Sequence, residues 1–344
     1  MTEHVPRRRP SLTDVAAHAG VSKGAVSKVI RDAYGVSPAM RARVESAIKE
    51  LGYRPRLAAR AMRGSSYSIG LELPNLGNEF FSEVFNGAGA GLVGSGYQLL
   101  MAPGLDQTGA IPVLENLADR QVDGVIAVSP EVSPEWLEEF ASTIPVVLVG
   151  RHDRSRNYDT VTSDDDTGTR LALGHLMDLG HRGIAHLTLA MTHERDDALP
   201  AHTIRRRTYE RMMAEAGLEP LVTYCGLDDE DIYRTAKELL THNKAVTAIF
   251  AGNDALAVAA LRAFDELGLS SSDVSIAGYD DIPLASHPRI SLTTVDQFGD
   301  RVGRTAAELL LERIRDGRAT PRNIELTPTL RVRGSTQPLD ASQR

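Results

Sequence analysis

The basic side chains of this sequence are concentrated at its N-terminal end. Residues 1–63 contain thirteen Lys and Arg against five Asp and Glu, a net charge of +8, whereas the whole chain has a net charge of −8. Residues 64–344 therefore carry a net charge of −16. Lysine and arginine can neutralise phosphates, and a basic segment joined to an acidic body is typical of a nucleic-acid-binding module attached to another domain. A solvated basic surface is the alternative, but it does not explain why the excess lies in the first fifth of the chain.

Residues for catalysis or metal binding do not form a recognisable pattern. Cys225 is the only cysteine, and the histidines between residues 175 and 202 lack the helical spacing beside a Glu that a zinc-protease motif requires. The glycines of residues 89–94 fit a dinucleotide-binding string, but they lie late in an expected helix, so we interpret them as close helix packing. Neither a phosphate-binding loop motif nor a nucleophile-elbow motif is present. We therefore expect no catalytic residue, no metal site and no cofactor.

The first 55 residues predict three short helices. The first helix follows the capping residue Ser11 and stops near Gly20; the second follows Ser22 and runs to about residue 31. A third helix starts after Ser37 and ends before Gly52. Two short helices joined by a tight turn are typical of a helix-turn-helix.

The rest of the chain alternates short apolar runs with helical stretches. This pattern predicts an α/β fold with two Rossmann-like parallel sheets, each covered by helices on both faces. Ligands of such sheets lie beyond the carboxyl ends of the strands. Polar residues follow several of the apolar runs at that position, although Asn and Asp also favour ordinary turns. They are Asn75, Ser129, Arg151, Asp164, Asn253, Asp254, Asp280 and Asp281.

Several sequence blocks together resemble one known family. The runs LTDVAAHAGVSKGAVSKVI and VSPAMRARVESAIKELGYRP are followed, in order, by SIGLELPNLGNEFF, VDGVIAVS, HLMDLGHRGIAHL, AIFAGNDALAVAAL, VSIAGYDDIPLA and LTTVDQ. This order resembles the lac-repressor/galactose-repressor (LacI/GalR) family of bacterial transcription regulators, from the N-terminal helices to the end of the chain. The resemblance implies a body like that of periplasmic sugar-binding proteins, in which the two sheets exchange segments.

The resemblance also implies which residues contact DNA. In the family, the second helix enters the major groove, and its first residues and its sixth read bases, which here implies Lys23, Gly24 and Lys28. Lysine can donate to guanine O6 and N7, whereas Ala25 can only touch a thymine methyl group. This chain has Ala25, Lys28 and Arg31 where Thr, Arg and Asn are usual, so the usual operator half-site is not expected. The expected contacts of this helix are Ser22, Lys23, Gly24, Ala25, Ser27 and Lys28.

Residues 56–63 resemble the hinge helix of that family. Eight residues are too few for a stable isolated helix, so an order–disorder transition on DNA is expected. The resemblance implies that an apolar residue wedges between base pairs in the minor groove, and Met62 occupies that position. The expected hinge contacts are Arg56, Ala59 and Met62.

Effector contacts follow from the same resemblance. Arg205, Asn253 and Asp280 occupy family positions that touch a small-molecule effector, and Phe80 or Phe81 could stack on a ligand ring. The chain lacks the aromatic residue common in the loop 226–229 and has Gly150 where Asp is common. A sugar is the leading expectation, and a nucleoside or another polar metabolite is the alternative. The expected effector contacts are Asn75, Phe80, Ser129, Arg151, Arg205, Asn253 and Asp280.

We therefore predict a cytoplasmic regulator, most simply a repressor, that binds a double-stranded DNA operator as a homodimer. The expected domains are a DNA-binding head (1–55), a hinge (56–66) and an effector-binding body (67–344). The expected subdomains of the body are 67–161 with 292–321, and 162–291 with 322–344. No apolar run is long enough to cross a membrane, and the C-terminus shows no leucine heptads for a tetramer. A ligand-carrying binding protein is the rival class, but it would need a signal peptide, which we do not find, and would have no helix-turn-helix.

Overall fold

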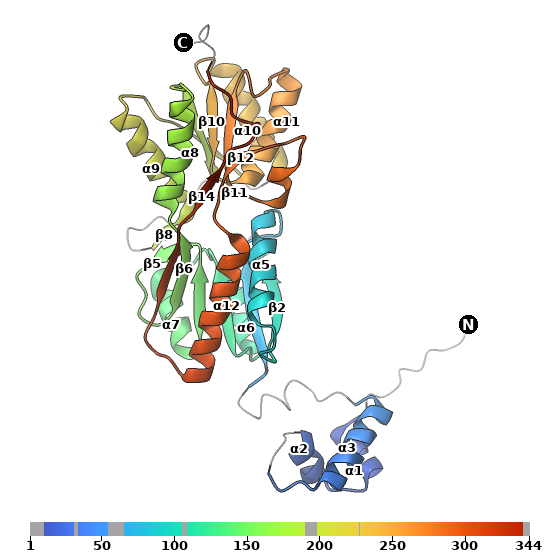
Figure 1. Ribbon diagram of the computed structural model, residues 1–344. Helices are drawn as coiled ribbons and strands as arrows, with labels where there is room; N and C mark the ends of the chain where they lie inside the picture. The colour runs from blue at the N-terminus through green and yellow to red at the C-terminus, as the bar shows by residue number, and fades with distance from the viewer. Residues whose placement is uncertain are drawn as a thin grey trace, which may run out of the picture. The chain divides into compact units, whose positions relative to one another are not determined.

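The computed structural model describes residues 10–30, 34–53, 65–104, 109–189, 198–226 and 228–339. It consists of two compact units, residues 1–66 and 67–344, which we call the head and the body (Figure 1). Among the described residues, no helix is long and apolar enough to span a membrane.

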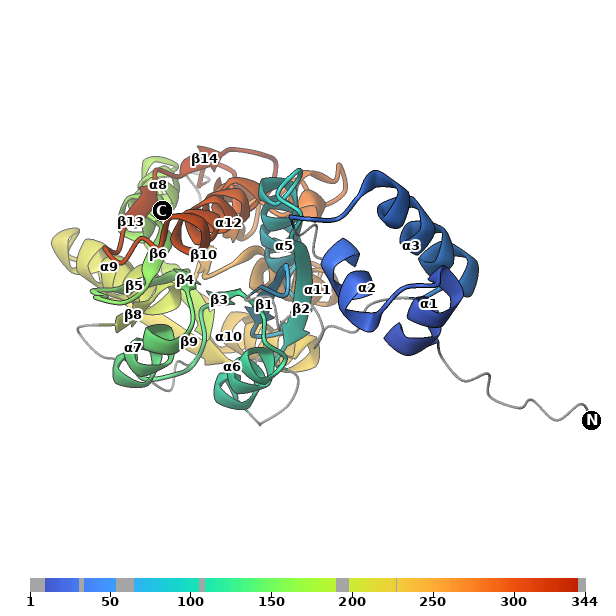
Figure 2. The ribbon, with the colours of Figure 1, turned by 90° about the horizontal axis from the view of Figure 1, so that it is seen from below.

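The described residues of the head form α1 (Leu12–Ala19), α2 (Lys23–Ile30) and α3 (Pro38–Leu51), which Figure 2 shows side by side. Ser11 and Asp14 form a reciprocal capping box at the start of α1, and Gly20 ends it with φ 64°. Val15, Val26 and Val44 are fully buried, so each helix contributes one apolar side to the core. The predicted helix-turn-helix is confirmed.

Two six-stranded sheets form the body (Figure 1). We call the sheet with order β13-β6-β4-β3-β1-β2 and its helices the first lobe, and the sheet with order β14-β12-β11-β10-β7-β9 and its helices the second lobe. The strands of the first sheet are β1 (Ser68–Leu73), β2 (Gln98–Pro103), β3 (Gly124–Val128), β4 (Val146–Val149), β6 (Asp159–Ser163) and β13 (Asn323–Leu326). Those of the second are β7 (Ile184–Leu189), β9 (Leu221–Cys225), β10 (Ala248–Ala251), β11 (Ser275–Asp280), β12 (Thr293–Asp296) and β14 (Thr329–Arg331). A short antiparallel pair, β5 (Arg151–Asp153) and β8 (Ala198–Pro200), lies apart from both sheets.

Helices cover both faces of each sheet, as the unbroken apolar strands predict. On the first lobe, α5 (Glu79–Gly91) and α12 (Gly299–Asp316) lie on one face, and α6 (Ala110–Asp119) and α7 (Pro134–Thr143) lie on the other. On the second lobe, α8 (Asp165–Asp178) and α9 (Ala201–Glu215) lie opposite α10 (Asp229–His242) and α11 (Asp254–Leu267), and η1 (Pro283–Ser286) is a short 3₁₀ turn after β11. The α/β fold with two parallel-sheet lobes is confirmed.

The chain crosses between the lobes at points that differ from the predicted boundaries. Residues 293–296 were assigned to the first lobe, but β12 pairs in parallel with β11 of the second sheet. Residues 323–326 were assigned to the second lobe, but β13 pairs in parallel with β6 of the first sheet. The crossings are therefore β6 to α8, β12 to α12, and β13 to β14. Local sequence did not show this because both short strands have similar patterns, and only the long-range pairing decides which sheet each joins.

Glycines let α5 and α12 approach each other closely. A Cβ atom on Gly87 would lie 1.9 Å from the carbonyl oxygen of Asp300, and one on Gly91 would lie 2.9 Å from that of Arg304. The interpretation of the glycine string as helix packing is therefore confirmed at Gly91, whereas a Cβ on Gly89 or Gly94 would meet nothing within 4 Å. The tight contact fixes the N-terminus of α5 beside the crossing from β12 to α12.

Candidate functional site

Asp280 links the two lobes at the carboxyl end of β11. Its side chain is 2% exposed and accepts a hydrogen bond at Oδ2 from the Asn78 amide, at 3.0 Å. Gln297, in the crossing to α12, donates to the other carboxylate oxygen at 2.5 Å. Asn78 is the N-cap of α5 in the first lobe, where its Oδ1 accepts from the Phe80 amide. The carboxyl ends of the two sheets therefore meet here, as expected for a ligand site in parallel sheets.

Arg205 lies beside Asp280 and is 3% exposed. Its Nε donates to Asp165 at 2.8 Å and its Nη1 donates to the Gly252 carbonyl at 2.7 Å, while Asp280 is 3.9 Å away. The guanidinium carbon lies 3.6 Å from the centre of the Tyr279 ring, a cation–π contact. The guanidinium group is thus held in one plane between a carboxylate and an aromatic face.

The carboxylate of Asp165 stays charged in this buried position. Burial alone would raise its pKa, but the charge of Arg205 and the hydrogen bond with His152 outweigh burial and lower the pKa to about 2. His152 Nε2 lies 2.9 Å from Asp165 Oδ2. The pKa of Asp280 moves the other way, to about 6, because burial outweighs the favourable charge of Arg205.

Asn253 and Asp254 shape the adjoining strand ends. Asn253 caps α11 by accepting from the Leu256 amide at 2.8 Å. Asp254 accepts from the Thr294 hydroxyl and from the Ile282 amide, and burial raises its pKa well above the usual value. These bonds hold the turn that follows Asp280.

Positive φ angles occur at the strand ends of both lobes. Ser129 (45°), Asp280 (121°), Asp281 (55°) and Phe298 (58°) adopt backbone conformations that side chains other than glycine rarely take. Such residues cost energy and are maintained where the surrounding structure requires them, often at ligand sites.

Two buried hydroxyl groups lie next to each other at strand ends of the two lobes. The Tyr279 hydroxyl, in β11, interacts with the Ser163 hydroxyl, at the end of β6. A Cβ atom on Gly168 would lie 2.2 Å from the Tyr279 hydroxyl, so only glycine leaves room for it.

Some of the expected effector residues lie together, and others have partners within their own segment. Three of them lie together at the carboxyl ends of β10 and β11: Arg205, Asn253 and Asp280. Phe80 is buried and packs edge-on to Phe81, with ring centres 6.1 Å apart. Asn75 accepts from the Gly77 amide within its own turn.

Arg151 has internal partners for most of its donors. It forms a two-point ion pair with Asp153 and also donates to the carbonyls of Pro130 and Val132. Ser129, next to Pro130, bonds weakly to the Gly150 carbonyl at 3.3 Å. Arg151 therefore holds the loop after β3 in place.

Sequence reasoning missed Asn78 and Gln297. Both stand inside blocks that carry the family resemblance, NEFF and LTTVDQ, so a signal was present. Their meeting with Asp280 was not predictable, because Asn78 is 202 positions away along the chain.

In the head, the outward side of α2 presents the expected DNA contacts. Ser22, Lys23, Gly24 and Lys28 are exposed, while Val26 and Val29 of the same helix are buried. Ala25 and Ser27 are partly exposed, and the Ser22 hydroxyl caps the helix by accepting from the Ala25 amide at 3.1 Å. Arg56, Ala59 and Met62 lie outside the described residues.

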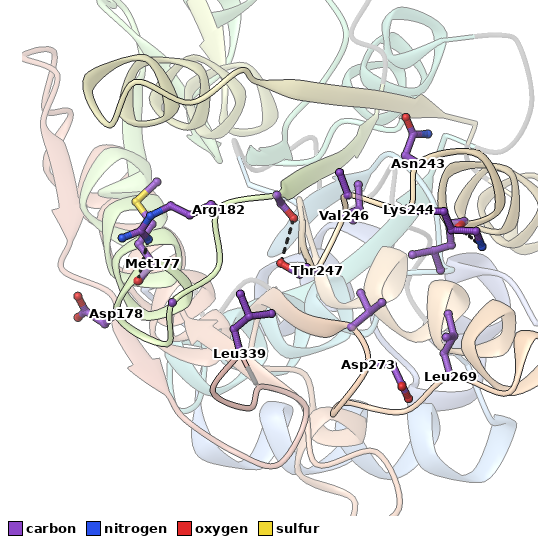
Figure 3. Close-up of a pocket in the computed structure, with 15 residues that line it drawn as sticks. Met177, Asp178, Arg182, Asn243, Lys244, Val246, Thr247, Leu269, Asp273 and Leu339 are labelled. Carbon is purple, nitrogen blue, oxygen red and sulfur yellow. Dashed lines mark hydrogen bonds between the residues drawn. The ribbon is translucent and has the colours of Figure 1, made fainter. Parts of the chain in front are cut away.

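A separate pocket of about 1020 Å³ lies at the opposite end of the second lobe (Figure 3). Three of its polar side chains have partners: Arg182 donates to the Met177 carbonyl, Lys244 to that of Leu240, and Thr247 to that of Gly183. No group of three or more metal-binding side chains occurs in the described segments, here or elsewhere. The junction of the lobes is therefore the stronger candidate site.

Known proteins resemble the chain over almost its whole length. Residues 11–56 match the family described as "Bacterial regulatory proteins, lacI family", and residues 173–336 match a "Periplasmic binding protein-like domain". The ribose operon repressor of Escherichia coli is 33% identical, with 94% of this chain and 99% of that protein covered.

Two solved structures agree in fold. The CelR–cellobiose complex has a TM-score of 0.68 at 32% identity, covering 95% of this chain and 100% of that one. The lac repressor dimer bound to operator and the anti-inducer ONPF has a TM-score of 0.79 at 25% identity, covering 96% and 100%.

Proposed function

We propose, from the premise that this chain belongs to the LacI family of bacterial DNA-binding transcription regulators, that its effector is a small uncharged sugar that contacts both Asp280 and Arg205. The family's regulators bind operator DNA and respond to small molecules, and this chain does so as a homodimer. Since operator DNA lies in the cytoplasm, we place the protein there.

The cross-lobe position of Asp280 carries this proposal. A carboxylate accepts two hydroxyl protons in one plane, which suits neighbouring hydroxyls of a sugar. Arg205, Asn253 and Gln297 add donors around it, and Asn78 adds one from the first lobe. Arg205 is already neutralised by Asp165, so an anionic effector such as a sugar phosphate finds no free counter-charge in this cluster.

Some of the relatives favour a sugar, while others are repressors named PurR. The most similar ones include a ribose operon repressor and a regulator solved with cellobiose. Asn75 and Ser129 follow β1 and β3 at their carboxyl ends, and Phe80 lies in the first turn of α5, so we propose these three as contacts from the first lobe. We assign Arg151 a positioning role, because Asp153 and two carbonyls occupy its donors.

For DNA we propose base contacts by Lys23 and Lys28 and phosphate contacts by Ser22 and Ser27, with Gly24 and Ala25 against the bases. The exposed side of α2 supports this. Arg56, Ala59 and Met62 are proposed as hinge contacts from the resemblance alone. The functional segments we propose are 1–55, 56–66 and 67–344.

A panel titration tests the effector proposal. The purified full chain is titrated with ribose, cellobiose and other neutral sugars, with sugar phosphates, and with nucleosides, using calorimetry and thermal shift. We expect a neutral sugar to bind the parent and to bind Asp280→Asn at least 5-fold more weakly, since a buried polar group on the ligand loses its partner. Binding of a nucleoside alone, or of a sugar phosphate alone, would contradict the proposal.

The matched control is Asp178→Asn, at the far end of the second lobe. It should bind the sugar like the parent. Operator sequences selected from random DNA then supply the second readout: Asp280→Asn should bind them without sugar as the parent does.

A further inference from the structure

Five carboxyl groups gather where the two lobes meet. Glu83 lies on α5 of the first lobe, Asp280 and Asp281 follow β11, Asp296 ends β12, and Asp300 lies in the first turn of α12. Glu83 points at the crossing between β12 and α12, because a Cβ atom on Gly299 would lie 2.8 Å from its Oε2. Carboxyls from both lobes therefore face one another at a chain crossing.

Arginines form close ion pairs with two of these carboxylates. Asp281 pairs with Arg333 at 2.7 Å, and Asp296 pairs with Arg331 at 2.8 Å. Asp280 has two amide donors but only a distant cation, Arg205, which is bound more closely by Asp165.

The charged groups near Glu83 are mainly carboxylates. Burial raises its pKa, and Asp280, Asp296, Asp300 and Asp281 raise it further, to about 7. The N-terminus of α12 at Gly299 acts in the opposite direction, since the positive end of a helix favours a carboxylate. Burial and the four carboxyls outweigh it.

The backbone at this place is strained. Asp280, Asp281 and Phe298 all have positive φ, and Phe298 joins β12 to α12. The Asn78–Asp280 hydrogen bond is the direct link between the lobes here. A change of one charge beside such a link can shift the balance between two lobe arrangements.

We propose that this carboxyl cluster makes the arrangement of the two lobes depend on pH, so that the regulator responds to protons near neutrality as well as to its effector. When Glu83 is protonated, its side chain is uncharged beside Asp280 and Asp296, and the hydrogen bond from Asn78 to Asp280 is kept. When Glu83 loses its proton, the negative charges on the two lobes repel each other and the lobes separate.

The raised pKa values of Glu83 and Asp280 decide which arrangement of the lobes low pH favours. The pKa values of Glu83 and Asp280 are raised in this arrangement, so the arrangement binds protons more tightly than an open one does. It is therefore favoured at low pH and weakens as pH rises through about 7. Weaker effector binding above that pH is a consequence that rests on the proposed function; the pH dependence of the lobes does not.

A distance measurement without effector or DNA tests the proposal. Spin labels are placed on the full chain at Ser142→Cys in the first lobe and Ser272→Cys in the second, both exposed, in a Cys225→Ser background. Pulsed dipolar spectroscopy from pH 5.5 to 8.5 should show a longer separation that grows in as pH rises toward 7 and then levels off. Glu83→Gln should keep the short separation throughout.

Glu79→Gln is the matched control, because Glu79 is exposed in the first turn of the same helix. It should follow the parent. A parent distance that does not change with pH, or an unchanged transition in Glu83→Gln, would overturn the proposal.

Asn78→Asp is a second variant that does not depend on Glu83. The new carboxylate can still cap α5 at the Phe80 amide, but it replaces the donor to Asp280 with a like charge. We expect the long separation already at pH 6. If this folded variant keeps the short separation, the junction is not controlled by charge. Failure to bind any sugar, by contrast, would leave these distances unaffected and would contradict the proposed function alone.

Discussion

Lys23 and Lys28 are exposed on α2 of the head, whereas Arg205 in the body is 3% exposed and bound to Asp165. The two settings suit different partners. Exposed lysines on a short rigid helix can meet a polyanion at little desolvation cost, and such binding weakens with salt. A buried, paired guanidinium instead offers fixed donors to a small molecule of matching shape, where geometry decides affinity.

Arg205→Ala gives the largest expected effect on the stability of the body. Removing one partner of a buried ion pair leaves Asp165 charged and buried, which costs about 3–5 kcal/mol of stability. We expect the body to unfold at lower denaturant concentration while the head keeps its own transition. The control is Arg170→Ala, which removes an exposed pair with Asp166 and should cost about 0–1 kcal/mol. Equal losses of unfolding free energy in both variants would show that the buried ion pair of Arg205 contributes no more to stability than an exposed one.

Acid should destabilise the body through buried histidines. Burial lowers the pKa of His186 to about 4, and the ring stacks on Phe250 with centres 4.8 Å apart. The unfolded chain takes up this proton near pH 6.5 and the folded chain only near pH 4, so stability is present above 6.5 and is lost as pH falls between them. At about 1.4 kcal/mol per unit the loss is about 3 kcal/mol.

Denaturant curves of the full chain at pH 7, 5.5 and 4.5 measure this. The substitution His186→Gln, which does not titrate, should flatten part of the dependence. A parent stability that stays constant between pH 7 and 4.5 would mean that His186 does not control the acid response.

Lys28→Ala tests whether the exposed lysine of α2 in the head reads bases. We expect altered preference at one base pair of each half-site, worth about 1–3 kcal/mol, with no change in sugar binding. Selection from random DNA measures it. Lys49→Ala, exposed on α3, is the control and should leave the preferred sequence unchanged. Should Lys28→Ala also leave that sequence unchanged, Lys28 contacts phosphate rather than bases.

Ser11→Ala has the smallest expected effect and tests how locally the head is stabilised. The variant loses the cap of α1, where the Ser11 hydroxyl accepts from the Asp14 amide. Loss of a helix cap costs about 1 kcal/mol. Thermal unfolding followed by circular dichroism should show a lower transition for the head, and effector binding by the body should match the parent.

Helix and strand positions could be read directly from the sequence. Ser11, Gly20, Ser37 and Gly52 mark the helix ends of the head, and the structure places caps at all four. Most apolar runs of the body become buried strands, whereas β2 and β9 stay largely or partly exposed. Helix ends and strands were predictable because capping and periodicity depend on residues a few positions apart. The family resemblance, and not the local pattern, indicated Arg205, Asn253 and Asp280 as effector positions.

Only the tertiary structure decided how the lobes join. It placed β12 and β13 in the sheets opposite to those expected, brought Asn78 to Asp280, gave Arg151 internal partners, and set Glu83 among other carboxyls. Each of these outcomes depends on pairing or burial between segments distant in sequence. The energy of a charge depends on what surrounds it in space, and a linear pattern does not contain that information.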